Sequence, residues 1–308
     1  MRPVPSALRR SVFHWAVGAL AGLALAPAAF AQAPAYPSKP ITIVVGYPPG
    51  GSTDLMGRMV GTELSNRLGQ PVVIENIGGA GGAIGAQKVA SAQPDGYTLL
   101  VGASNELAIN KLVTKKVKYD IKDFTAIGLI ASQPLVLVAS TGAGVKNMAE
   151  FTQKVSKNPG KFSYGSSGVG TALHLAGEAV KEQGKLFMTH IPYRGVAPLT
   201  SDLMGNNLEY GVFVLSSGLP HIKSGKVIAL GTTEAKRSAL TPDIPALGEN
   251  AKLKGMDIGS WFVLMGPAGL PEPVAARLKT ALNESLKSPD FRKRMEASGS
   301  SVASPDVD

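Results

Sequence analysis

The chain of 308 residues contains no cysteine. Disulfide bonds and metal sites with thiolate ligands are therefore excluded. Groups that stack on nucleic-acid bases are also scarce, since there are seven Tyr and two Trp. The Lys and Arg residues are scattered along the chain and form no basic cluster. This distribution argues against binding of nucleic acid.

An apolar run stands at the N-terminus, behind Arg2, Arg9 and Arg10, and it closes in Ala29-Phe30-Ala31. This pattern predicts a secretory signal peptide over residues 1–31, cleaved after Ala31. The alternative is a transmembrane anchor, but the run is short and Pro27 interrupts it. The residues around Arg9-Arg10 fit the twin-arginine pattern poorly, which favours the general secretory route.

Cleavage would remove three arginines and no acids, so the formal charge would fall from +9 to +6. A mildly positive field favours encounter with anionic small molecules, although it says nothing about the fold. Without disulfides, buried apolar surface must stabilise the remaining chain. Its length is about right for two α/β domains.

From Ile41 onward, short β-branched runs alternate with segments of helical periodicity. Leu55, Met59 and Leu68 share one stripe of a predicted helix that stops at Gly69. Strands separated by helices of this length predict βαβ units and parallel sheets. The simplest architecture is two α/β sheets side by side. Strands are expected over 41–47, 71–76, 97–103, 134–140, 161–165, 186–190, 208–214, 227–233 and 260–266.

Three loops follow predicted strands and precede predicted helices, at 46–54, 101–107 and 164–171. Ligands of α/β proteins bind at this end of parallel strands. In the first loop, glycines let the backbone approach a ligand, and Ser52 or Thr53 is expected to cap the next helix. In the third loop, the cap is expected at Gly170 or Thr171.

The start of a helix leaves unpaired N–H groups and a partial positive charge, so an anion fits there without an arginine. Each loop taken alone also fits an ordinary capped helix. However, the first and third loops lie in different halves of the chain. If the halves face each other, their helix N-termini converge on one cleft that would hold a carboxylate and close by a hinge motion.

Catalytic motifs are missing. Residues 165–168, Gly-Ser-Ser-Gly, lack the spacing of G-x-S-x-G, and residues 78–86 miss the dinucleotide register. His174, His190 and His221 have no zinc-ligand spacing, and the acids are dispersed. His174 either faces the cleft or is an ordinary solvent-facing or core histidine. We therefore expect no catalytic residue, no metal and no cofactor.

Several segments in a fixed order resemble one family: "YPSKPITIVVGYPPGGSTD", "GQPVVIENIGGAGGAIGA", "PDGYTLLVG", "FSYGSSGVGTALHLAGE", "IPYRGVAP", "LPHIKSGK" and "SWFVLMGPAGLP". They resemble the Bug family of extracytoplasmic solute receptors, the binding components of tripartite tricarboxylate transporters. The resemblance runs from Tyr36 to about Gly299. It implies a type II periplasmic-binding-protein-like α/β fold with a ligand cleft between two lobes. Lobe 1 would comprise residues 32–130 plus 246–308, and lobe 2 residues 131–245.

The resemblance also implies a periplasmic protein that captures a small carboxylate, namely a dicarboxylate, a tricarboxylate or an aromatic acid. Backbone, hydroxyls and bridging waters would hold the ligand. Arg194 stands where the family often has lysine, and it either acts in the cleft or is solvated. The ligand-binding residues carried over by motif are Tyr47, Gly50, Gly51, Ser52, Thr53, Ala80, Gly81, Ser104, Asn105, Ser166, Gly170, Thr171, Tyr193 and Ser216.

Two departures from the family pattern have consequences. Many members carry an acid near the position of Phe213, where this chain has only apolar residues followed by Ser216-Ser217. Its absence predicts a ligand without an amine, because an unpaired buried ammonium is disfavoured. The chain also stops at a point where relatives continue into a further helix, which predicts frayed last residues and a less covered lobe 1.

The resemblance implies a monomer whose partners are the integral-membrane subunits of a transporter. A receptor that acts on a sensor kinase is the alternative, with the same ligand chemistry. A secreted enzyme that acts on a small organic acid comes third.

Overall fold

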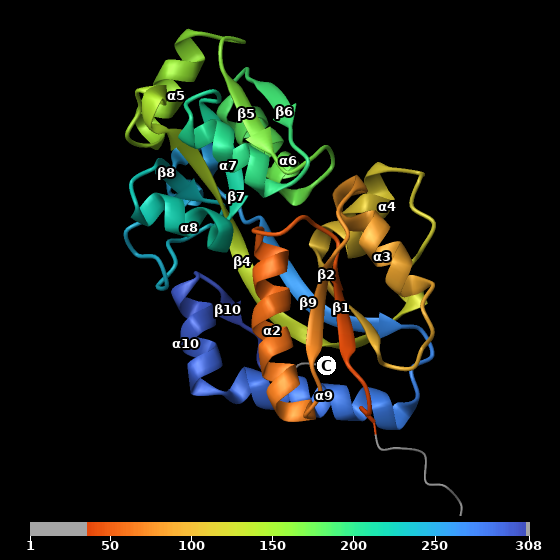
Figure 1. Ribbon diagram of the computed structural model, residues 1–308. Coiled ribbons are helices and arrows are strands. Elements are labelled where there is room, and N and C mark those ends of the chain that lie inside the picture. The colour runs from red at the N-terminus through yellow and green to blue at the C-terminus, as the bar shows by residue number, and fades with distance from the viewer. Residues whose placement is uncertain (1–35, 306–308) are drawn as a thin grey trace, which may run out of the picture. The chain divides into compact units, whose positions relative to one another are not determined.

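The computed structural model describes residues 36–305. Its strands lie in the order β2-β1-β3-β9-β4-β7-β5-β6, and β8 and β10 also pair with β4 (Figure 1). The predicted signal peptide lies outside the described residues. The strands are β1 (Ile41–Val45), β2 (Val72–Asn76), β3 (Thr98–Ala103), β4 (Phe124–Ser140), β5 (Ser163–Ser166), β6 (Thr189–Pro192), β7 (Tyr210–Val214), β8 (Val227–Thr232), β9 (Gly259–Pro267) and β10 (Ser301–Val302).

Helices connect most of these strands, as the alternating pattern predicts. A π-helical turn at Asn105–Ile109 leads into α4, and a 3₁₀ turn covers Ala251–Leu253. The α-helices are α2 (Ser52–Leu68), α3 (Ala83–Ala90), α4 (Asn110–Val113), α5 (Met148–Lys157), α6 (Ala172–Gly184), α7 (Val196–Met204), α8 (Leu215–Lys223), α9 (Glu272–Lys287) and α10 (Pro289–Ala297).

The prediction of parallel sheets is correct for the two ends of the strand order. β1 runs parallel to β2 and β3, and β5 runs parallel to β6 and β7. It is wrong for the middle, because β9 and β4 run antiparallel to their neighbours. The fold is α/β, and Figure 1 shows the two groups of parallel strands in two lobes.

Strand β4 belongs to both groups of strands. It pairs with β9 up to Pro134 and with β7 from Leu135 onward, and Figure 1 shows it running between the two groups. The sequence predicted only its second half, at 134–140, because the first half contains Gly128 and breaks the pairing register there. The boundaries expected for the lobes stay a prediction.

Helix α2 packs unusually close to the sheet, and this packing aims its N-terminus at the carboxyl ends of the strands. A Cβ atom at Gly57 would lie 2.8 Å from Val45 Cγ2, and one at Gly61 would lie 3.0 Å from Ile74 Cδ1. A larger residue at either position would therefore force the facing side chain of the sheet to shift. Gly69 ends the helix in the left-handed conformation, as predicted (φ 70°).

The end of the chain is packed as far as Ala303, whereas the last three residues, to which the expectation of fraying applies, lie outside the described residues. Helix α10 buries Phe291 and Met295, and the short strand β10 pairs with β4. Ser300 is fully buried. Neither α10 nor α8 was expected from the sequence, and in α8 Pro220 lies inside the helix.

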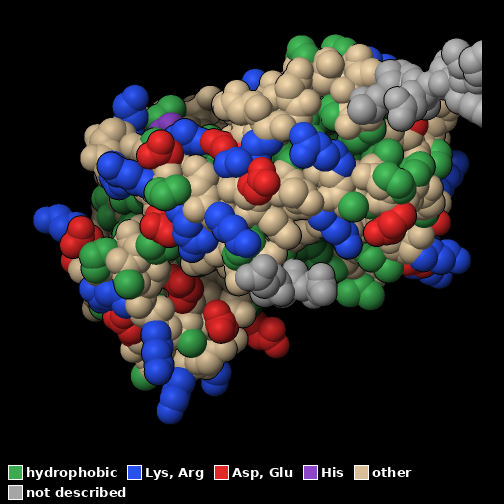
Figure 2. Space-filling model, turned by 90° about the horizontal axis from the view of Figure 1, so that it is seen from below, with side chains coloured by type: hydrophobic (Ala, Val, Ile, Leu, Met, Phe, Trp, Pro, Cys, Tyr) green, Lys and Arg blue, Asp and Glu red, His purple; other side chains and the backbone are tan. Residues whose placement is uncertain are grey.

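The surface carries its charges in a mixed pattern. On the face drawn in Figure 2, Lys and Arg residues alternate with acids and apolar side chains and do not gather into one basic patch. Within residues 36–305 no helix is long and apolar enough to cross a membrane.

Candidate functional site

A small cavity lies where the first and third predicted loops meet. We call it the inner cavity, and its volume is about 40 Å³. Its walls come from both lobes, so the two loops converge as expected. Its lining residues are Tyr47, Pro48, Gly51, Ser52, Thr53, Ala103, Asn105, Ser167, Ala172, Leu173, Val196, Val214, Ser260 and Phe262.

Two helix N-termini contribute to this lining, from α2 and from α6. In α2 the first N–H group with an acceptor inside the helix is that of Leu55, which bonds Gly51 O. The N–H groups of Ser52 and Thr53 therefore have no acceptor in the helix. The N-cap residue is Gly51 and no side chain caps the helix, so the predicted cap at Ser52 or Thr53 is wrong. Both of these residues already lie inside the helix.

Helix α6 is capped as predicted. The Thr171 side chain accepts a hydrogen bond from the His174 N–H. The Leu175 N–H bonds Thr171 O, which leaves the N–H groups of Ala172 and Leu173 without an acceptor in the helix. Two helices thus direct their positive ends at one small space.

Ser52 adds a hydroxyl to the inner cavity. Ser216 Oγ donates to Ser52 Oγ at 2.9 Å, a bond that joins α8 to α2. Because the Ser52 oxygen is the acceptor of that bond, its own proton is free to donate elsewhere.

Asn105 bridges the cleft. Its Oδ1 accepts from the Ala172 N–H at 2.7 Å, and its Nδ2 donates to the Tyr47 hydroxyl at 3.0 Å. Tyr47 follows β1 and Asn105 follows β3, whereas Ala172 begins α6, which follows β5. The side chain therefore fixes the two lobes against each other beside the inner cavity.

A larger space, the outer chamber, adjoins the inner cavity and shares Tyr47, Pro48 and Ser167 with it. Its volume is about 750 Å³. Arg194 is the one Lys or Arg residue in its wall, and residues 36–305 place no carboxylate at ion-pair distance from it. The lining residues are Tyr47, Pro48, Pro49, Asn76, Gly78, Gly79, Ala80, Gly81, Gly82, Ser167, Gly168, Val169, Tyr193, Arg194 and Gly195.

No Asp or Glu lines either space in the described part of the chain. Asp54, in the first turn of α2, is held by hydrogen bonds from Gly50 N (3.0 Å), Arg58 Nε (3.0 Å) and Asn76 Nδ2 (2.9 Å). Burial opposes its ionisation, but these hydrogen bonds outweigh burial and lower its pKa. The Arg58 guanidinium, with Nη2 3.0 Å from Asp54 Oδ1, offsets this negative charge.

Glu106 lies behind the wall of the cleft and is fully buried. Burial raises the pKa of Glu106 to about 7, although hydrogen bonds from Ala103 N and Tyr47 partly offset the effect. The Tyr47 hydroxyl contacts three polar atoms: Glu106 Oε2 (2.9 Å), Gly81 O (2.9 Å) and Asn105 Nδ2 (3.0 Å). Tyr47 has one proton and can donate to only one acceptor. A protonated Glu106 that donates to Tyr47 lets Tyr47 donate to Gly81, so all three contacts are satisfied.

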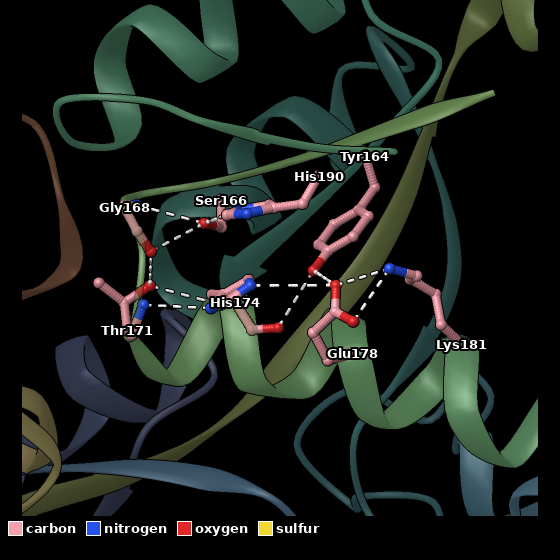
Figure 3. Close-up of polar contacts among 9 residues, drawn as sticks. Tyr164, Ser166, Gly168, Thr171, His174, Glu178, Lys181 and His190 are labelled. Carbon is pink, nitrogen blue, oxygen red and sulfur yellow. Dashed lines mark hydrogen bonds and ion pairs between the residues drawn. The ribbon is translucent and has the colours of Figure 1, made fainter. Parts of the chain in front are cut away.

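The loop at 166–171 is supported from behind by two histidines. His190 Nε2 lies 2.7 Å from Ser166 Oγ, and the Gly170 N–H donates to His174 Nδ1 at 3.1 Å (Figure 3). The two imidazole rings are stacked with centroids 4.0 Å apart. His174 is thus half-buried, with a side chain that is 20% exposed, and its ring is paired with that of His190.

The structure brings together most of the residues carried over by motif. Ser52, Thr53, Gly51, Asn105 and Tyr47 line the inner cavity, and Ala80, Gly81 and Tyr193 line the outer chamber. That these residues bind a ligand stays a prediction.

Six of the carried-over residues line neither space. Ser166 is buried and faces His190, because side chains alternate along a strand and its neighbour Ser167 takes the cleft side. Thr171 caps α6, and the Gly170 N–H is taken by His174. The Gly50 N–H bonds Asp54, Ser104 lies 3.3 Å from Ser260, and Ser216 bonds Ser52.

Some lining residues carry no signal in the sequence. Ser260 and Phe262 come from β9, far along the chain from the loops. Val214, and not Phe213, closes the end of β7, since Phe213 is fully buried in the core on the other side of that strand. The alternation of the strand pattern would have found Ser167.

Comparison with known proteins shows that the chain is similar to one family of receptors. A family model described as "Tripartite tricarboxylate transporter family receptor" matches residues 56–308. The protein BugT of Bordetella pertussis is 31% identical over 295 residues, which cover 94% of this chain and 90% of that protein.

Solved structures are similar over nearly the whole described chain. The periplasmic binding protein BugD is 34% identical with a TM-score of 0.81, covering 88% of this chain and 92% of that one. A Rhodopseudomonas palustris protein solved with adipate is 30% identical with a TM-score of 0.84, covering 88% and 91%. MatC from Rhodopseudomonas palustris, solved with bound malate, is 30% identical with a TM-score of 0.80, covering 87% and 91%.

Proposed function

Because the chain belongs to the tripartite tricarboxylate transporter receptor family, a family of solute-binding receptors, we propose that it captures a small carboxylate without an amine and delivers it to a membrane transporter. We further propose that it does so in the periplasm, after cleavage of the signal peptide behind Ala31. The ligand is bound and released unchanged.

One observation carries the proposal: the N-termini of α2 and α6 meet at the inner cavity. A water-sized group needs about 15 Å³ of such volume, so 40 Å³ holds roughly three heavy atoms, the size of one carboxylate group. The N–H groups of Ser52, Thr53 and Leu173, which have no acceptor within their helices, and the Ser52 hydroxyl supply its donors. The outer chamber then holds the rest of the acid, since its volume is within the usual range for ligand pockets.

The lack of acids in both linings supports the absence of an amine. An ammonium group would find no carboxylate partner there, and an unpaired buried ammonium costs several kcal/mol. Adipate and malate, which the two similar structures hold, are both acids without an amine.

Titration calorimetry tests the ligand class, with adipate and malate as probes against glutamate and aspartate. We expect one of the first pair to bind at least a hundredfold more tightly than either amino acid, the factor that about 3 kcal/mol produces. Tighter binding of glutamate or aspartate would refute the proposed ligand class. An absence of binding by all four acids would count against the carboxylate site itself.

The inner cavity is tested by the double variant Ser52→Ala and Thr53→Ala. We expect this variant to bind the ligand about tenfold more weakly or worse. The Ser52 hydroxyl no longer donates to a ligand oxygen, and the wall of the inner cavity loses the Thr53 hydroxyl. Thr62→Ala is the matched control, since Thr62 is an exposed residue on the same helix whose hydroxyl bonds Arg58 O. Equal affinity of both variants would contradict the assigned anchor.

The outer chamber is tested by Arg194→Gln. A distal acid group that approaches Arg194 loses a solvent-exposed ion pair in this variant, so we expect a modest loss of about threefold for adipate that disappears at high salt. An unchanged affinity at low salt would place Arg194 outside the site as a solvated residue.

Delivery and location need separate measurements. Uptake of labelled ligand by cells that lack the receptor should return with the wild-type chain and not with the Ser52→Ala, Thr53→Ala variant. Ligand-dependent signalling without any effect on uptake would favour the sensor-kinase alternative. Protein recovered from the periplasm should begin at Gln32.

A further inference from the structure

A cluster of titratable side chains lies directly behind the cleft loop and takes no direct part in the proposed binding. Figure 3 shows His174 on α6 beside His190 of β6. The two rings are stacked, with an interplanar angle of 24°. Tyr164, Glu178 and Lys181 surround the pair. The Tyr164 hydroxyl donates to Glu178 at 2.6 Å, and Lys181 Nζ lies 2.8 Å from the same carboxylate.

Each histidine holds one end of the loop that lines the cleft. At its start, His190 contacts the Ser166 hydroxyl, and at its end His174 accepts the N–H of Gly170. Between these two points, Ser167 lines both the inner cavity and the outer chamber. The position of a cleft residue thus depends on two imidazole contacts.

The His174 contact needs an unprotonated nitrogen. Because Nδ1 accepts from the Gly170 N–H, its lone pair must be free and the ring proton must sit on Nε2. Nε2 lies 3.9 Å from Glu178 Oε1. This distance is too long for a hydrogen bond, so the proton stays on Nε2. Protonation of Nδ1 would set two N–H groups against each other, and the end of the loop would lose its support.

The surroundings favour the neutral pair. Burial lowers the pKa of His174, and the carboxylate of Glu178 only partly opposes this effect. Burial, and then the neighbouring His174, lower the pKa of His190 to about 4. Two charged rings at stacking distance would also repel each other.

Other elements packed on α6 add little charge near the pair. Strand β4 carries no charged residue, and β7 contributes Tyr210, whose ring packs against Phe151 and Phe162. The turn at Ala251–Leu253 contributes the exposed Lys252. On α6 itself the charged neighbours are Glu178 and Lys181.

We propose that His174 and His190 are positioning residues that couple ligand affinity to protonation, so that the receptor holds its carboxylate when the pair is neutral and binds it more weakly when His174 is protonated. This inference rests on the proposed function. It adds a pH-dependent control that acts through the Gly170 N–H and the loop, without contact between either histidine and the ligand.

Two variants at one position separate the lost acceptor from the lost ring. His174→Asn keeps an acceptor oxygen at the place of Nδ1 and cannot be protonated. His174→Gln has a similar volume but places its polar atoms near the former Nε2, so Gly170 loses its acceptor. The binding probes are adipate and malate, measured by calorimetry between about pH 7.5 and about pH 5.

We expect the wild-type affinity to fall about tenfold more over this range than that of His174→Asn, as the loss of one hydrogen bond predicts. His174→Gln should bind about tenfold more weakly already at about pH 7.5. The ligand's own titration affects all three proteins equally and cancels in the comparison. Identical pH profiles for the wild type and His174→Asn would overturn the proposal.

Nitrogen-15 NMR of the ligand-free protein gives a readout that does not depend on binding. We expect an unprotonated Nδ1 in His174 at neutral pH, and a Gly170 amide signal that moves as His174 titrates. In His174→Asn that signal should stay in place. A Gly170 signal that ignores the titration would refute the coupling, whereas normal coupling without any binding of the probes would refute the proposed function alone.

Discussion

Replacement of Glu106 by glutamine tests whether the carboxyl group behind the cleft is a neutral acid. Glutamine keeps an oxygen to accept the Ala103 N–H, which Glu106 Oε1 now accepts at 2.8 Å, and its NH₂ group can donate to Tyr47. The variant therefore resembles the protonated side chain. The stability of the variant should therefore differ from that of the wild type only in the pH range in which Glu106 is ionised.

The magnitude follows from the shift in pKa. In the folded protein the pKa of Glu106 is about 7, against an ordinary value of 4.5, and each unit corresponds to about 1.4 kcal/mol, so ionisation of the buried group costs roughly 3 kcal/mol. Because the folded-state pKa is raised, this cost is absent below about pH 4.5, grows between about pH 4.5 and about pH 7, and is constant above that. The variant should therefore gain stability over the wild type as the pH rises above about 4.5, and the gain should be complete above about pH 7.

Thermal unfolding followed by circular dichroism at about pH 5 and about pH 8 measures this difference. For a chain of this size, 3 kcal/mol corresponds to a rise in Tm of roughly 6 °C. We expect a rise of up to that size at the higher pH and a much smaller one at the lower pH. Glu182→Gln, an exposed position on α6, serves as the control.

A stability difference that is the same at both pH values would show that Glu106 does not titrate in this range. A variant that is less stable at both would mean that the Tyr47 network needs a carboxylate. Either result would refute the assignment of the proton to Glu106.

Three further predictions concern the cleft. Gly170→Ala should lose about 1–2 kcal/mol of stability because Gly170 has φ 76° and its new Cβ would lie 2.7 Å from Val113 Cγ2, whereas Gly225→Ala, with φ 69° and open space, bears only the conformational cost; denaturant unfolding checks both. Asn105→Ala should weaken ligand binding by about tenfold, because the Ala172 N–H loses its partner across the cleft, and calorimetry that finds no change would refute the bridge. A bound acid at a hundredfold excess over Kd should stabilise the protein by about 2.7 kcal/mol, which a thermal shift assay would detect.

The approximate position of the site follows from local sequence features. Glycine and serine loops between a β-branched run and an amphipathic segment predict helix N-termini at the cleft end of a sheet, and the structure has α2 and α6 there. Most strands also lie where the runs of apolar residues indicate. Such features depend on neighbours within a few residues, so the sequence alone is sufficient.

Errors in the predicted elements have a physical pattern. The first half of β4 was not predicted, because it contains glycine and polar residues. Pairing with β9, which is distant in sequence, stabilises it as a strand. Helix α8 contains Pro220, and its place is set by packing against β4, β7 and β8. In both cases tertiary contacts outweigh a weak local preference.

By itself the sequence determined the α/β class, the absence of cysteine chemistry and the loops that supply helix N-termini. Only the tertiary structure decided that Ser167 faces the cleft while Ser166 faces His190, that Ser260 joins the lining, and that two histidines stack behind the loop. The reason is that the packing of segments far apart in the chain decides which side of a strand faces the cleft. The same packing decides which residues lie opposite that side. The raised pKa of Glu106 is a further example, because it results from burial among segments that meet only in the folded protein.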